Sequence, residues 1–155
     1  LNIVPRFGAQ VAPIDFMYMK SVFEVTRVLD PFAARLAVDR ITTEQIAELE
    51  SIIERLKTYD IEVDYRKAII DDQRFHDIIF LSSDNACLQE ILPDLHNHTE
   101  RLWHYSQRFF DTMDLFTDSL GKTLDAIKER DKDKVEKYAR DHIDAFVDKI
   151  RQELL

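Results

Sequence analysis

The sequence is poor in the residues that interrupt regular structure. It contains two glycines and four prolines among 155 residues, too few for the tight turns of a many-stranded β-protein. Leu, Ile, Glu, Lys and Ala are abundant, and most of these residue types favour helices. The sequence therefore predicts an all-α fold in one domain, long enough to bury a substantial core.

Cysteine and long apolar runs are also scarce. Cys87 is the only cysteine, which excludes an intramolecular disulfide, and its apolar neighbours favour a buried structural thiol over a reactive one. No apolar run approaches the roughly 18 residues of a membrane span, and no secretory signal is visible. These features predict a cytoplasmic protein without membrane contact.

Positive charge is in deficit. The chain has 21 Lys and Arg against 30 Asp and Glu, a net charge of -9. Because binding to a phosphate backbone depends on clustered Lys and Arg, we expect any contact with DNA to come from another domain.

Helical periodicity and capping residues predict six helices. Short connections between them favour antiparallel neighbours and hence a compact bundle. Asp15 is expected to cap the first helix, Thr42 with Gln45 to form a capping box on the second, and Asn85 to cap the fourth. Pro31 is expected to break or kink the first helix. The expected ranges are 15–40, 42–59, 64–81, 85–110, 116–130 and, opened by Asp131 or Asp133, the remainder of the chain.

Four polar residues interrupt apolar helical stripes: Asp72, His76, His98 and His142. On the fourth helix, heptad spacing from Leu88 predicts that His98 faces inward, whereas His96 and His104 do not. A buried carboxylate needs a compensating partner, which an imidazole or a metal ion supplies.

Asp72 and His76 are one helical turn apart, the spacing by which a helix offers two ligands to one divalent ion. His142 from another helix would be a third ligand, although a metal-free, hydrogen-bonded pair explains the same spacing. The chain has no Glu-x-x-His repeat, no Gly-rich phosphate loop and no GxSxG motif. We therefore expect no enzymatic activity, with a stand-alone helical-bundle metalloenzyme using the Asp/His cluster as the alternative.

Five features follow one another along the chain: EVTRVLDPFAARLA at 24–37, DQRFH at 72–76, SDN at 83–85, LDAIKERD at 124–131, and His142. Their order and spacing resemble the effector-binding C-terminal domain (FCD) of FadR-type regulators in the GntR superfamily of bacterial transcription factors. The resemblance covers about residues 16–152. It implies six or seven antiparallel helices around a central cavity, a dimer, and a small effector that is commonly a carboxylate.

The resemblance also implies two parts of the chain. Residues 1–14 look like the end of the wing and the linker of a winged-helix domain, and residues 15–155 like the effector-binding bundle. On this interpretation the DNA-binding half lies upstream of Leu1 and is missing from the sequence.

Many members of the family hold a divalent metal, and Asp72, His76 and His142 match three of its ligands. The position of the fourth ligand is Leu120, so water, the effector or another side chain such as His98 would complete a zinc or nickel shell, unless the site holds no metal. Thr26 stands where the family often has an effector-binding arginine, for which Arg101 is the candidate substitute. The residues expected to bind effector are Thr26, Asn85, His98, Arg101 and Leu120.

Overall fold

The structure, a computed structural model, describes residues 2–4, 8–10, 13–106 and 110–154. Six helices make up most of it, which confirms the predicted all-α bundle. Their bounds are α1 Phe16–Ala37, α2 Thr43–Thr58, α3 Ile61–Ser82, α4 Ala86–Tyr105, α5 Asp114–Lys128 and α6 Lys132–Leu154.

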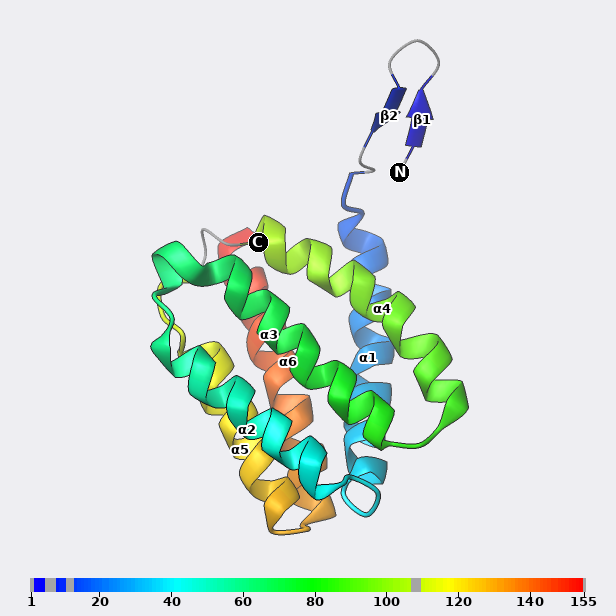
Figure 1. The fold of residues 1–155 in the computed structure, drawn as a ribbon. Helices are drawn as coiled ribbons and strands as arrows, with labels where there is room; N and C mark the ends of the chain where they lie inside the picture. The colour runs from blue at the N-terminus through cyan, green and yellow to red at the C-terminus, as the bar shows by residue number, and fades with distance from the viewer. Residues whose placement is uncertain (1, 5–7, 11–12, 107–109, 155) are drawn as a thin grey trace.

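The six helices contact one another in a closed ring, and in Figure 1 α2, α3 and α4 lie in front of α1, α5 and α6. Going round the ring, α1 packs against α4, α4 against α3, α3 against α2, α2 against α5, α5 against α6, and α6 against α1 again. Contacts between α1 and α3 cross the ring. This order places α1, α3, α4 and α6 around one interior region, where the site described below is found.

Local capping explains where most helices begin. The Asp15 carboxylate accepts hydrogen bonds from the backbone at Met17 and Tyr18, both at 3.1 Å, and Asn85 accepts one from Leu88 at 3.0 Å. Both caps are as predicted. The third helix begins earlier than expected because Asp60 is the residue that caps it.

The two internal prolines do not end their helices. Both α1 and α4 continue as α-helix through Pro31 and Pro93, so the expected break at Pro31 is absent. Tyr105 is the last helical residue of α4, and Phe110 is not helical. The predicted extension of this helix over 107–109 lies outside the described residues.

The capping box at the start of α2 is expected to stabilise the protein. Thr42 accepts from the backbone at Gln45, whose side chain accepts in return from the backbone at Thr42. We expect Thr42→Ala to lower the free energy of unfolding by about 0.5–2 kcal/mol, measured by urea denaturation. Ser51→Ala, an exposed hydroxyl in the middle of the same helix, should leave stability unchanged or slightly raised. Equal losses in both variants would show that the cap contributes nothing.

Two short strands precede the bundle. β1 (Asn2–Val4) pairs antiparallel with β2 (Gly8–Gln10), with Asn2 opposite Gln10. The pair lies beyond the N-terminal end of α1 (Figure 1). That residues 1–14 are a wing and linker stays a prediction.

The surface corrects one expectation. Cys87 is exposed, so the prediction of a buried thiol is wrong. It lies in the first turn of α4, where Leu88 is the residue that turns inward.

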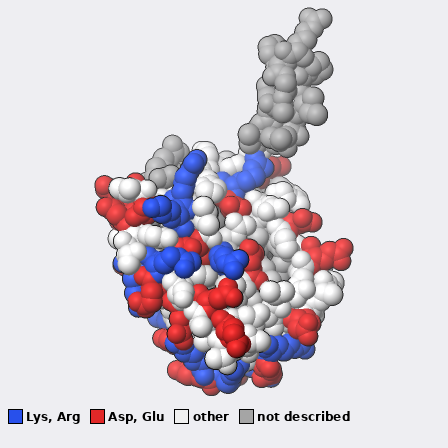
Figure 2. Space-filling view, in the orientation of Figure 1, with Lys and Arg blue, Asp and Glu red and all other residues white. Residues whose placement is uncertain are grey.

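On the face drawn in Figure 2, acidic and basic side chains are interspersed. None of the described helices combines the length and the hydropathy needed to cross a bilayer.

Candidate metal centre

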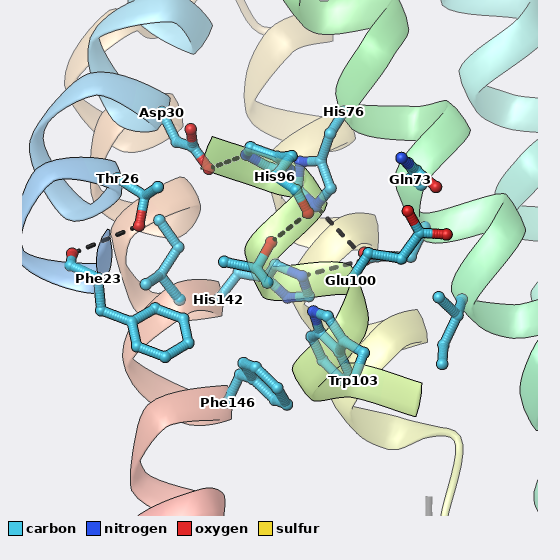
Figure 3. Close-up of a pocket in the computed structure, with 14 residues that line it drawn as sticks. Phe23, Thr26, Asp30, Gln73, His76, His96, Glu100, Trp103, His142 and Phe146 are labelled. Atoms are coloured by element: carbon cyan, nitrogen blue, oxygen red, sulfur yellow. Dashed lines mark hydrogen bonds and ion pairs between the residues drawn. The ribbon is translucent and has the colours of Figure 1, made fainter. Parts of the chain in front are cut away.

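Asp72, His76 and His142 meet inside the ring of helices. Figure 3 shows two of them, His76 and His142, reaching the same cavity from different helices. Asp72 and His76 lie one turn apart on α3, and His142 comes from α6. The Oδ1 atom of Asp72 is 3.1 Å from His142 Nε2 and 3.4 Å from His76 Nε2. One donor atom from each residue lies within 4.8 Å of the others. The three residues form one cluster of oxygen and nitrogen donors.

Burial makes this cluster electrostatically coupled. Asp72 is only 5% exposed, and burial by itself opposes ionisation of its carboxyl group. The charge of His76 and the hydrogen bond from His142 outweigh that effect and hold the pKa of Asp72 below its usual value. Burial likewise opposes protonation of His76, but the neighbouring Asp72 carboxylate raises its pKa overall. Asp72 is therefore an ionised carboxylate, the form that binds a cation.

Two of the three donor separations fit a divalent metal. Two donors, each about 2.1 Å from a tetrahedral zinc ion, lie roughly 3.4 Å apart. The separations of Asp72 Oδ1 from the two imidazole nitrogens are close to this value. One carboxylate and two imidazoles also match the donor preferences of zinc and nickel. The residues present therefore suit an ion with three protein ligands and at least one open position.

A cavity of about 40 Å³ opens next to the cluster. It has room for about three water molecules, since each needs about 10–15 Å³ by this measure. Its polar lining comes from four helices, and Phe23, Trp103 and Phe146 form much of the apolar wall. A smaller cavity of about 20 Å³ lies against His76, His142 and Leu120.

Among the lining residues that sequence reasoning missed is a hydrogen-bonded pair, Asp30 and His96. His96 Nε2 donates a hydrogen bond of 2.7 Å to Asp30 Oδ2, and the His96 ring lies 5.5 Å, centroid to centroid, from His76. Both residues line the larger cavity. The expectation that His98 rather than His96 faces inward is therefore wrong.

Strict heptad counting caused this error. The α4 helix buries a stripe that follows the true helical period, made up of Leu88, Leu92, Thr99, Leu102 and Trp103. At 100° per residue, His96 lies about 60° from Thr99, whereas His98 lies about 100° away. Counting from the middle of the whole apolar stripe would have selected His96.

The other predicted residues are distributed unevenly. Thr26 lines the larger cavity and Leu120 the smaller one. Asn85 caps α4, and His98 packs edge-on against Tyr18 with ring centroids 5.2 Å apart. Arg101 is exposed. The described residues that line the two cavities do not include Asn85, His98 or Arg101.

Comparison with known proteins yields a family and a fold. The model of a family described as the FCD domain matches residues 21–145. A search of curated proteins found no match. E. coli McbR/YncC superposes with a TM-score of 0.85 at 18% identity, covering 99% of this chain and 73% of that one.

Two further solved structures share the fold. A transcriptional regulator of the GntR family from Pseudomonas syringae pv. tomato str. DC3000 gives a TM-score of 0.79 at 19% identity, covering 99% of this chain and 63% of that one. The Streptococcus agalactiae GntR gives 0.69 at 19% identity, covering 84% of this chain and 58% of that one. The chain therefore spans only part of each of these proteins.

Proposed function

Because the chain belongs to the FCD domain family, we propose that it is the ligand-sensing domain of a DNA-binding transcriptional regulator. The match covers residues 21–145, most of the bundle. The solved structures with this fold include one titled a transcriptional regulator of the GntR family. On this basis the alternative of a stand-alone metalloenzyme is not favoured.

We propose that Asp72, His76 and His142 hold a divalent metal, zinc or nickel, and that a small organic acid binds beside it. A bound ion would supply an open coordination position for a carboxylate oxygen. Around the acid, the protein contributes the aromatic side chains of the cavity wall and the hydroxyl of Thr26. The cluster carries this proposal because a buried carboxylate and two imidazoles share one centre beside a cavity.

The arrangement of the site explains how a ligand would be sensed. The residues around the cavity come from α1, α3, α4 and α6, so an effector that contacts all four helices favours one relative placement of them. A ligand shifts a regulator between two states only through its different affinity for each. We propose that the readout is a change within a homodimer, transmitted through the linker at residues 1–14 to DNA-binding domains upstream.

Elemental analysis of the purified protein, combined with mass spectrometry of small molecules released on denaturation, tests this proposal. We expect close to one equivalent of a divalent transition metal and a co-purified small acid. If the protein neither contains nor takes up such a metal, and binds no acid, the sensing proposal fails. Chemical conversion of a bound compound by the purified protein would favour the alternative, a stand-alone metalloenzyme.

Leu120 offers a test of the incomplete ligand set. Its side chain lines the smaller cavity together with His76 and His142. We expect Leu120→His to add a fourth protein ligand and to tighten zinc binding by about tenfold or more, measured by competition with a chromophoric chelator. Leu124→His is the matched control, since Leu124 is buried on the same helix but lines neither cavity. Equal affinities in the two variants would place the ion away from Leu120.

A further inference from the structure

The larger cavity contains a second carboxylate that the metal centre does not use. Asp30 of α1 is 6% exposed, and its Oδ2 accepts the hydrogen bond from His96. Its Oδ1 is buried and has no hydrogen-bond partner among the described residues. Buried polar atoms in proteins nearly always have a partner. Asp30 lines both cavities, so its unpaired acceptor lies beside the space that a ligand would occupy.

The charges around the larger cavity indicate what kind of donor it would take. Its lining includes three carboxylates, Asp30, Asp72 and Glu100, and three histidines, and none of the described lining residues is Lys or Arg. Asp72 is compensated by His76 and His142. Glu100 stands nearer the solvent, with a side chain 30% exposed. The Asp30 end of the cavity therefore attracts positive charge, and hydrogen bonds to an ionised group are strongest where water is excluded.

We propose that the Asp30–His96 pair is a subsite for a protonated amino group, so that the effector is a short amino acid. Its carboxylate faces the Asp72, His76 and His142 cluster, a part of the inference that rests on the function proposed above. Thr26 lies one turn before Asp30 on α1 and lines the same cavity. Its hydroxyl donates to Phe23 O at 3.4 Å, which leaves its oxygen as a further acceptor. The cavity volume of about 40 Å³ limits the ligand to a small molecule.

Isothermal titration of the zinc-loaded protein with matched probes tests this subsite. Each series has one chain length and differs only in the terminal group: glycine, glycolate and acetate; β-alanine, 3-hydroxypropionate and propionate; 4-aminobutyrate, 4-hydroxybutyrate and butyrate. In at least one series we expect the amino acid to bind about tenfold or more tightly than its hydroxy and unsubstituted counterparts, because it alone offers Asp30 a charged donor.

Substitution of Asp30 separates this subsite from direct chelation of zinc by the amino nitrogen. Asp30→Asn should abolish the preference for the amine while unsubstituted acids still bind. Asp94→Asn, the same change at an exposed position of α4, should keep it. If Asp30→Asn does not fold, the 4-aminobutyrate series decides, because chelation there would need a large, loose ring.

The outcomes also separate this subsite from the proposed function. Acids that bind equally well with and without the amine would overturn the subsite and leave the sensing function standing, with water satisfying Asp30 Oδ1. A preference that survives in Asp30→Asn, or one absent from the 4-aminobutyrate series when that variant does not fold, would be chelation and would equally overturn the subsite. If zinc binds but no probe does, the result contradicts both the subsite and the proposal that the effector is a carboxylate.

Discussion

Replacing Asp72 with alanine is expected to weaken zinc binding by more than about 100-fold, since loss of a mere hydrogen-bond partner of a metal ligand already costs 10–100-fold. The Oδ1 atom of Asp72 lies within 3.4 Å of both imidazole nitrogens. Its removal takes away a ligand and the charge that balances the ion. Neither remaining donor of the cluster can replace that charge, because both histidines are neutral when they bind metal.

The effect is measurable as stabilisation by zinc. At a free zinc concentration 100 times the wild-type Kd, binding stabilises the wild-type protein by about 2.7 kcal/mol, whereas a variant with 100-fold weaker binding gains only about 0.4 kcal/mol. Asp118→Ala is the matched control, because Asp118 is an exposed carboxylate on α5. It should respond to zinc as the wild type does. Full stabilisation of Asp72→Ala would show that the ion binds elsewhere.

Replacing Phe116 with alanine is expected to lower the free energy of unfolding of the metal-free protein by about 3–5 kcal/mol. Phe116 of α5 is completely buried. Its ring lies 6.2 Å from Tyr65 of α3 and 5.1 Å from Trp103 of α4, centroid to centroid. One side chain thus joins three helices, and its loss leaves a cavity behind the aromatic wall of the site. A domain with a total stability of about 5–15 kcal/mol would lose a large share of it.

Urea denaturation of the metal-free protein measures this loss. Phe32→Ala is the matched control, since Phe32 is 43% exposed on α1 and its truncation should cost roughly 1 kcal/mol or less. Near-equal losses in the two variants would contradict the described packing of α3, α4 and α5.

The features that sequence reasoning found are those set by neighbours along the chain. The caps at Asp15, Thr42 and Asn85 depend on contacts within three residues, and Asp72 and His76 share a helical face by their spacing alone. His142 was visible because it interrupts an apolar stripe. That it meets Asp72 is a hypothesis that the family resemblance strengthens and local spacing cannot establish, because 70 residues separate the two.

The features that were missed depend on how helices pack. The hydrogen bond between Asp30 and His96 joins α1 to α4 across 66 residues, and no local pattern encodes it. His96 was assigned to the wrong face because a heptad drifts from the true period by about 20° per repeat. The start of α3 was placed late because Asp60 and Asp64 are equally good capping residues, and the structure selects Asp60.

Anomalous X-ray scattering from crystals grown with zinc would test most directly whether three helical side chains hold a metal ion inside this bundle. We expect one strong peak at the zinc absorption edge, about 2.0–2.2 Å from a carboxylate oxygen of Asp72 and from one nitrogen each of His76 and His142. A map with no peak between these residues, in crystals where zinc is bound at other positions, would contradict the metal centre.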